Sequence, residues 1–348
     1  MTSAEDQPFA LPSQPQGVPW PTGEWPEGAP EIPDDEVTAG RVDSLFTDTG
    51  RLGRTDALVV VQGGRLVLER YREGTNRDTT QPSWSMAKSF LHAMVGLSGL
   101  NEALSEPVGE PAWSEPGDPR GAITLDQMLR MISGLEWLEE YVPGQSSDVI
   151  DMLFGSGADD VAAFAAAKPL VHEPGTVWVY SSGTSNIVSA AVARRLGVEG
   201  DRSGYGRELH RLLFDPLGMS SAIPKFDDHG TWIGSSYCFA TPRDFARFGL
   251  LYLRDGVWED RRLLPEGWVD HARHLTAPSV GQDDLEYGAH FWLNRDRFGS
   301  FSARGFMGQR IRMVPALDLI VVRSGATDET QKESLTAALD ELVEAFAA

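Results

Sequence analysis

The sequence predicts an α/β protein of the α+β type, with a mostly antiparallel sheet flanked by helices and an inserted helical subdomain. Strand-like segments occur near both ends of the chain, and the stretch between them, about residues 110–230, has mostly helical periodicity. Strands that lie far apart in sequence must then pair to bury their apolar faces. We therefore expect the sheet to be assembled from both ends of the chain.

The domain organisation follows from length and proline content. A chain of 348 residues with 41% hydrophobic residues suits one large interrupted domain or two domains. We expect a main domain over residues 40–348, with the helical subdomain inserted between its two parts and a proline-rich arm over residues 1–39. Eight prolines precede residue 35, together with Trp20 and Trp25. Packing of this arm against the body and disorder both stay open.

Charge and cysteine content exclude several classes of partner. A net charge of -21 and a pI near 4.7 repel nucleic acid and anionic membranes, so neither is expected as a partner. Cys238 is the single cysteine, which rules out an intramolecular disulfide and a thiolate metal cage, and it is expected to be an ordinary buried residue. The start lacks a secretory signal pattern and no run of eighteen apolar residues occurs, so a cytoplasmic location is expected. The oligomeric state stays open.

The individual elements are predicted in chain order. Residues 57–62 and 65–71 form a hairpin turning at Gly63 and Gly64, and an apolar helix follows Ser85. A capping box at 124–127 begins a helix that stops near Gly134. Further elements are helices over 159–167, 184–196 and 207–213, strands over 288–293, 300–304, 309–314 and 319–323, and a closing helix with Leu335, Leu339, Leu342 and Phe346 on one side.

A serine and a lysine three residues apart are the first candidate site. Lysine fills four of the 30 basic positions, and Lys88 follows Ser85 at helical spacing. A partly buried lysine can lose its proton, whereas arginine cannot, and a neutral amine beside a hydroxyl can activate serine as a nucleophile. A surface lysine on an ordinary helix is the alternative.

Two further clusters are weak signals by themselves. Tyr180 stands two residues before Ser182 in a glycine-bounded turn that leads into a helix, which can aim a phenol and a hydroxyl at one site. A buried tyrosine beside a helix cap is the alternative. Glycines interrupt a late strand over 303–309, as happens where a ligand approaches the backbone or where a strand bulges.

In order and separation, the three clusters resemble the serine β-lactamase and penicillin-binding-protein superfamily, whose signature is S-x-x-K, an S-D-N-type element and K-T-G. The resemblance is to the branch with class C β-lactamases, family VIII carboxylesterases and nylon-oligomer hydrolases, where tyrosine begins the middle element. It covers about residues 40–345. The segments that carry it, beyond 84–90, are 131–137, 174–183, 240–249 and 308–309.

The resemblance implies a role for each matching residue. Ser85 becomes the nucleophile, Lys88 its base and Tyr180 the phenol that passes a proton to the leaving group. Ser182 replaces the polar residue that orients lysine and substrate. The oxyanion hole comprises the backbone N–H groups of Ser85 and Gln309, and each such donor lowers a barrier by about 3 to 4 kcal/mol.

The third motif departs from the family pattern. Phe306, Met307 and Gly308 stand where a cation is usual, and Arg304 is expected on the other face of the strand. The resemblance then implies an apolar acyl pocket and poor turnover of β-lactams. The remaining substrate-binding candidates are Trp84 and Trp178, expected to wall the cleft, and Tyr141, from a loop that reaches the pocket in relatives.

The sequence gives no sign of metal or conventional-triad chemistry. It contains neither H-E-x-x-H nor G-x-S-x-G, and His172, His271 and His274 are interpreted as surface or helix-end residues. We expect a serine hydrolase without metal or organic cofactor, acting through an acyl-enzyme on a small-molecule ester or linear amide, with the ester favoured. Amide hydrolysis of the nylon-oligomer kind and acyl transfer are the alternatives. A β-lactamase or a non-catalytic binding protein ranks below them.

Overall fold

The computed structural model describes residues 9–32, 34–141, 144–281, 286–294 and 296–347. Within these ranges, seven strands form one sheet in the order β2-β1-β12-β11-β10-β9-β8, and every neighbouring pair is antiparallel. The strands are β1 Arg54–Gln62, β2 Arg65–Tyr71, β8 Glu286–Tyr287, β9 Trp292–Leu293, β10 Phe301–Gly305, β11 Gln309–Val314 and β12 Leu319–Ala326. The expected antiparallel sheet is confirmed.

Strands from the two ends of the chain meet at the centre of the sheet. The predicted hairpin is present as β1 and β2, and β1 pairs along its length with β12, from Arg54 opposite Ala326 to Gln62 opposite Leu319. Alternate residues of β1 enter two different cores: Val59 and Val61 belong to one, and Leu58 and Val60 to the other. The sheet is therefore buried on both faces at this strand.

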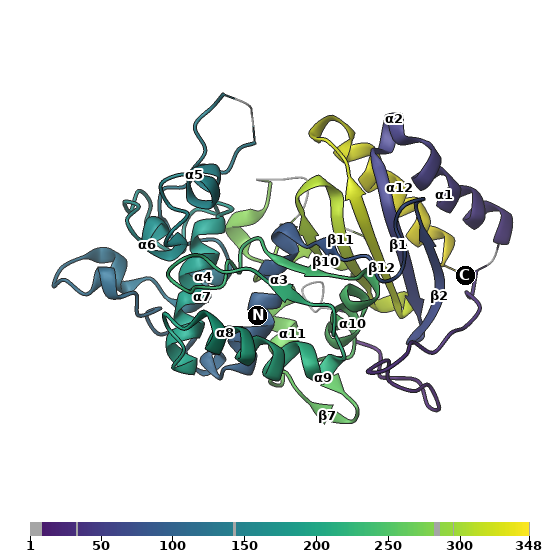
Figure 1. Cartoon of the computed structure of the whole chain (residues 1–348), viewed down its shortest axis with the longest axis horizontal. Coiled ribbons are helices and arrows are strands. Elements are labelled where there is room, and N and C mark those ends of the chain that lie inside the picture. The colour runs from purple at the N-terminus through teal and green to yellow at the C-terminus, as the bar shows by residue number, and fades with distance from the viewer. Residues whose placement is uncertain (1–8, 33, 142–143, 282–285, 295, 348) are drawn as a thin grey trace.

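Helices cover each face of the sheet (Figure 1). On one face lie α1 (Asp35–Thr47), α2 (Thr49–Leu52) and α12 (Lys332–Ala345), whose predicted apolar side is buried against the sheet. On the other face lie α3 (Ala87–Leu97) and α10 (Pro242–Leu253). The absence of a side chain at Gly249 lets α10 approach the sheet closely, because a Cβ there would lie 2.9 Å from Ile311 Cγ2.

The middle of the chain forms a mainly helical group beside the sheet, on the left in Figure 1. It contains α4 (Leu125–Leu129), α5 (Asp148–Phe154), α6 (Val161–Ala166), α7 (Ser182–Leu196), α8 (Arg202–Leu209), the π-helix His210–Phe214 and α9 (Asp215–Leu217). The predicted capping box opens α4. The other described strands and α-helix are β3 (Gln81–Pro82), β4 (Ile223–Pro224), β5 (Cys238–Ala240), β6 (Val257–Trp258), β7 (Arg261–Arg262) and α11 (Trp268–Arg273).

The proline-rich arm packs against the body of the molecule over its described residues. Trp25 is buried and its indole N–H donates to the carbonyl of Arg243 at 3.3 Å. Arg247 donates to the carbonyl of Pro21 at 2.7 Å, and the Trp20 ring lies 5.1 Å from that of Trp258. Helix α1 begins at Asp35, inside the segment assigned to the arm. Residues 1–8 and 33 lie outside the described residues.

The strand predicted over 288–293 is mostly wrong. Strand β9 includes Trp292 and Leu293, whereas 288–291 turn back toward α3 and α11. Gly288 lies against α11, since a Cβ there would be 1.9 Å from the carbonyl oxygen of Ala272. His290 has a left-handed backbone (φ 55°) and its carbonyl accepts from Ser89 Oγ at 2.7 Å. For residues 288–291, these contacts replace the sheet hydrogen bonds that we expected from the apolar run over 288–293.

No helix in the described part of the chain is both long and apolar enough to cross a membrane.

Candidate active site

Ser85 lies in a tight turn at the start of α3. A 3₁₀ turn, Trp84–Met86, leads into the helix, and Trp84 before the serine has a left-handed backbone with φ 44°. Such strain persists only where neighbours hold it. Ser83 supplies this hold: its N–H donates to the carbonyl of Cys238 at 3.2 Å and its Oγ accepts from the N–H of Cys238 at 2.9 Å. Cys238 itself is buried.

Lys88 occupies the next turn of the helix and is almost fully buried. Its side chain reaches Ser85, because the ammonium nitrogen lies 3.2 Å from Ser85 Oγ. The same nitrogen lies 2.9 Å from Ser182 Oγ and 3.0 Å from the carbonyl oxygen of Ser235. The structure thus brings Ser85 and Lys88, predicted from one motif, together with Ser182, predicted from another.

Ser182 links Lys88 to Glu139. Helix α7 begins at Ser182. The Ser182 hydroxyl lies 2.8 Å from one carboxylate oxygen of Glu139, and the Ser182 N–H donates to the other at 2.7 Å. Trp137 and Tyr141 also donate to this carboxylate, at 2.8 and 3.1 Å. Because a carboxylate can only accept, the Ser182 hydroxyl proton points to Glu139.

These contacts assign the protons of a neutral Lys88 amine. The Ser235 carbonyl can only accept, and Ser182 must accept as well, since its own proton goes to Glu139. A neutral amine has two hydrogens and one lone pair. Both hydrogens are then used, and the lone pair faces the remaining neighbour, the hydroxyl of Ser85. This is the geometry that a base needs to accept the serine proton.

The pKa of Lys88 is lowered from its ordinary value to about 8. Burial away from water is the main cause, and the negative charge of Glu139 acts in the opposite direction. Lys88 is also the second residue of α3, where the positive end of the helix dipole disfavours a cation. A useful fraction of the amine is therefore neutral near pH 8.

Tyr180 lies beside Lys88 and is supported by other aromatic rings. The lysine nitrogen is 4.7 Å from the centre of the Tyr180 ring. Trp292 and Tyr287 lie 5.4 and 6.1 Å from that ring, centre to centre. Trp178 packs 6.3 Å from it and is not among the residues that line the cavity described next. Trp178 thus supports Tyr180 from outside this cavity.

A mainly apolar cavity opens at Ser85. Its empty volume is about 420 Å³, part of it open to solvent. The predicted residues Trp84, Tyr141 and Phe306 line it, and Tyr141 stacks on Phe306 with ring centres 4.5 Å apart. The other lining residues are Ser236 and three from α5, namely Ile150, Leu153 and Phe154. None of these lining residues carries a charge.

The third motif forms the turn between β10 and β11. Gly305 touches the nucleophile turn, since a Cβ there would lie 2.3 Å from the carbonyl oxygen of Ser83. The buried Arg323 donates to the carbonyls of Met307 and Gly308, each at 3.1 Å. The Gln309 carboxamide bonds to both backbone groups of Gly325, at 2.6 and 3.1 Å. The backbone of Gln309 is therefore held firmly at the first position of β11.

The remaining residues of this motif lie at the rim or on the other side. Met307 is exposed and has a left-handed backbone (φ 59°). Arg304 lies on the α12 face of the sheet, as expected, and therefore cannot take the place of the missing cation.

Comparison with known proteins agrees with this geometry. A family model described as Beta-lactamase matches residues 48–344. The chain belongs to the β-lactamase family. Membership confirms the resemblance seen in the sequence and, with the hydrolases among the relatives, the prediction of a serine hydrolase.

Three relatives illustrate the range of this β-lactamase family. A 6-aminohexanoate-dimer hydrolase of Paenarthrobacter ureafaciens is 24% identical over 318 residues, which are 84% of this chain and 79% of that protein. A Bacillus anthracis structure named as a candidate 6-aminohexanoate-dimer hydrolase is 21% identical with a TM-score of 0.76, covering 98% of this chain and 90% of its own. EstCE1, described as a hydrolase with promiscuous acyltransferase activity, is 14% identical with a TM-score of 0.64, covering 90% and 99%. The two structures show a shared fold.

Several residues of this β-lactamase-family site were missed by sequence reasoning. Glu139 lies in a loop 43 positions from Ser182, and no spacing connects the two. His290 packs behind the base: its Nδ1 donates to the carbonyl of Lys88 at 3.0 Å, and burial with the nearby lysine lowers its pKa to about 3. His271, expected at the surface or a helix end, does lie in the last turn of α11, but it is largely buried there, 2.7 Å from Asp126 and 3.1 Å from His92.

The Glu139→Gln variant is expected to move the acid limb of the pH profile to lower pH, by roughly 1 pH unit. The Glu139 charge raises the pKa of Lys88, so its removal lets the neutral amine persist at lower pH. Activity also falls, because an amide can donate to Ser182 and disturb the proton arrangement. The measurement is kcat/KM against pH, with Glu140→Gln as the matched control, since Glu140 is exposed and bonds through its backbone N–H to Ser147. Equal shifts in the two variants would contradict this role for Glu139.

Proposed function

We propose that the chain hydrolyses esters with an uncharged acyl group through an acyl-enzyme at Ser85. The observation that carries the proposal is the set of three contacts at Lys88, which leaves the lone pair of a neutral amine directed at the serine hydroxyl. Burial supports this role, because it lowers the pKa of Lys88 to about 8 and makes the neutral amine accessible near that pH.

In the proposed acylation step, Lys88 accepts the proton of Ser85 as the oxygen bonds to the substrate carbonyl carbon. The carbonyl electrons move onto its oxygen, which the N–H groups of Ser85 and Gln309 bind. When this intermediate collapses, the bond to the leaving oxygen breaks, Tyr180 gives its phenol proton to that oxygen, and Lys88 returns the proton taken from Ser85 to Tyr180. The close approach of Gly305 to Ser83 supports this oxyanion site, because it brings the start of β11 next to the nucleophile turn.

In the deacylation step, water replaces the alcohol. As the water oxygen bonds to the acyl carbon, one water proton passes through Tyr180 to Lys88. The bond between the acyl carbon and the Ser85 oxygen then breaks, and Lys88 returns that proton to Ser85. Ser182 keeps the amine oriented throughout, since its own position is held by two hydrogen bonds to Glu139 that involve no reacting atom.

The cavity lining supports an uncharged substrate. Tyr141, Phe306 and Phe154 offer apolar surface to an acyl chain, and no lining residue could compensate a carboxylate or an amine. Burial of an unpaired charge there would be costly. This also supports the expectation that β-lactams, which carry a carboxylate, are poor substrates.

Hydrolysis of a linear amide is the second candidate, favoured by the similarity to the 6-aminohexanoate-dimer hydrolase of Paenarthrobacter ureafaciens. The charged ends of such a dimer would have to remain in the solvent-open part of the cavity. The uncharged lining thus ranks esters first.

A direct comparison of substrates tests this ranking. We expect kcat/KM for p-nitrophenyl butyrate to exceed that for 6-aminohexanoate dimer, with Ser85→Ala subtracting background hydrolysis. Faster turnover of the dimer would reverse the ranking, and turnover of neither would count against both. Product analysis with added alcohol separates acyl transfer, which gives a new ester, from hydrolysis, which gives the acid alone.

The cytoplasmic location stays a prediction from the sequence.

A further inference from the structure

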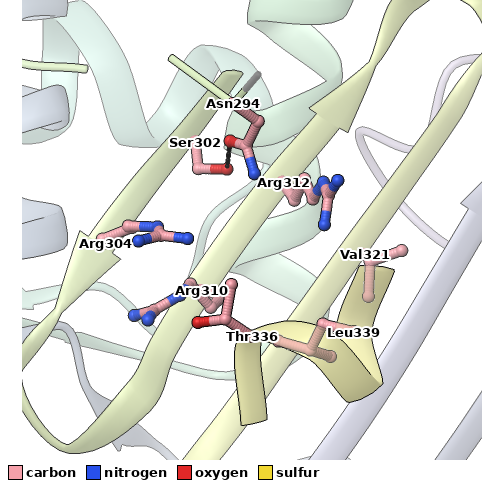
Figure 2. A pocket seen from close by; sticks show the side chains of 8 residues that line it. All are labelled: Asn294, Ser302, Arg304, Arg310, Arg312, Val321, Thr336 and Leu339. Carbon is pink, nitrogen blue, oxygen red and sulfur yellow. Dashed lines mark hydrogen bonds between the residues drawn. The ribbon is translucent and has the colours of Figure 1, made fainter. Parts of the chain in front are cut away.

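A second cavity lies on the opposite face of the sheet, beneath α12 (Figure 2). Strands β10 and β11 form its floor, and the sheet separates it from the cavity at Ser85. Its lining is unusually rich in arginine for a chain of net charge -21. The residues are Asn294, Ser302, Arg304, Arg310, Arg312, Val321, Thr336 and Leu339.

Arg310 is the central feature of this cavity, because its charge is buried without a carboxylate. It is 5% exposed. Its Nη1 donates to the neighbouring carbonyl of Gln309 at 2.9 Å, while its Nε has no hydrogen-bond partner among the described residues. No ion pair to Arg310 occurs in that part of the chain either. A buried guanidinium with so few partners is costly unless something else binds it.

The neighbours of Arg310 increase this cost. Arg304 and Arg323 are its direct cross-strand partners, so three guanidinium side chains emerge in one row on the same face of the sheet. Arg323 is fully buried and bonds to neutral oxygens, among them the carbonyls of Met307 and Arg54. Like charges in directly opposed positions destabilise a sheet. Burial and the charges of Arg323 and Arg312 lower the pKa of Arg310 to about 9.

The carboxylates near the cavity are already used. Asp340 of α12 and Asp296 both bond to Arg312, at 2.5 and 2.7 Å. The Nε of Arg312 is buried and, like that of Arg310, has no partner among the described residues. The buried Nε donors of Arg310 and Arg312, two residues apart on the same face of β11, are thus left without an acceptor among the described residues.

Among the neutral polar groups of the lining, the Asn294 amide suits an anion. Thr336 also lines the cavity (Figure 2), but its hydroxyl donates to the carbonyl of Lys332 at 2.9 Å and so has no proton left for an anion. The Asn294 side-chain oxygen accepts from Ser302 Oγ at 2.8 Å, which leaves its amide hydrogens as donors. The cavity has room for one particle about the size of a water molecule. That size leaves no room for phosphate, sulfate or an organic acid, and a monatomic anion, which is slightly larger than water, needs the least adjustment of the lining side chains.

We propose that this cavity is a binding site for a halide-sized anion, chloride or bromide, held by Arg310 and Arg312 between the sheet and α12. The ion supplies the negative charge that Arg310 lacks among the described residues. It stabilises the strand that begins with Gln309, but it lies on the other side of the sheet from the reacting atoms. The site is therefore independent of the function proposed above.

Thermal unfolding of the full chain in sodium chloride and in sodium gluconate, at equal ionic strength in halide-free buffer, tests the proposal. For the wild type we expect Tm to rise with chloride by about 2 °C for each tenfold increase above the dissociation constant. Arg310→Met should show no such chloride-specific rise and should be at least as stable in gluconate, because it removes an uncompensated charge. A chloride-specific rise of the same size in Arg310→Met, or none in the wild type, would overturn the proposal.

Two controls make the result decisive. Arg297→Gln removes an exposed guanidinium that pairs with Glu344 of α12, and it should respond to chloride as the wild type does. Crystals of the wild type soaked in sodium bromide should give an anomalous peak within contact of Arg310. If Arg310→Met does not fold, this peak still decides: its absence at saturating bromide would show that a water molecule fills the site.

Discussion

Ser85→Ala is expected to abolish turnover, with kcat falling by about 10⁴ to 10⁶. Alanine removes the oxygen that bonds to the substrate carbonyl, and no other hydroxyl among the described residues lies at the start of α3 facing the Lys88 lone pair. The measurement is intact mass after exposure to a fluorophosphonate, together with kcat on p-nitrophenyl butyrate. Wild type should gain the mass of one adduct, and the variant none.

Ser98→Ala is the matched control for this experiment. Ser98 lies at the opposite end of α3 and bonds to the carbonyl of Val95 within the helix, so its loss should leave labelling and turnover unchanged. An adduct of equal yield in Ser85→Ala would place the nucleophile elsewhere and would contradict the assignment.

Lys88→Met is expected to lose activity by about 10³ to 10⁴ while the free energy of unfolding rises. Methionine has a similar length and no proton to exchange, so the base is lost without leaving a large cavity. In the folded protein the pKa of Lys88 is about 8, below the ordinary 10.5. Each unit of that difference corresponds to about 1.4 kcal/mol, so burial of the lysine costs the folded state roughly 3 kcal/mol at neutral pH. Loss of the bonds to Ser182 and Ser235 offsets part of the gain.

The sign of this effect depends on pH. Because the folded pKa lies below the unfolded one, the cost is fully present below pH 8 and disappears as the pH rises from about 8 to 10.5. Urea unfolding should therefore show Lys88→Met more stable than wild type at pH 7, by about 1 to 3 kcal/mol, with the difference shrinking toward pH 10. A variant that is less stable at pH 7 would indicate that Lys88 is mainly structural.

Local patterns in the sequence predicted what depends on local geometry. The hairpin over 57–71 depends only on residues that are close together in the sequence. The same holds for the pairing of Ser85 with Lys88, because the helical turn between them fixes their relative position. The aromatic turn before α7 was found through its resemblance to a family motif, since nothing in the residues by themselves relates Tyr180 to Lys88, 92 positions earlier. The order of the three motifs along the chain, which matches the family, is what related Tyr180 to Lys88.

Features that depend on tertiary contacts were not predicted. Glu139 binds Ser182 because a loop folds across the start of α7, and neighbouring Glu140 looks equivalent in the sequence. The apolar run near His290 suggested a strand, but contacts with α3 and α11 turn it aside. Arginines alternate along β10 and β11, and nothing in their local sequence indicates that α12 covers them.

The pH dependence of acylation in the wild type tests the central claim most directly. The rate of covalent labelling of Ser85 by an activated ester, measured in single turnovers, should rise with pH and level off above an apparent pKa of about 8, the value expected for Lys88. A rate that does not change between pH 6 and 9, or a limb that persists in Lys88→Met, would contradict a neutral lysine as the base.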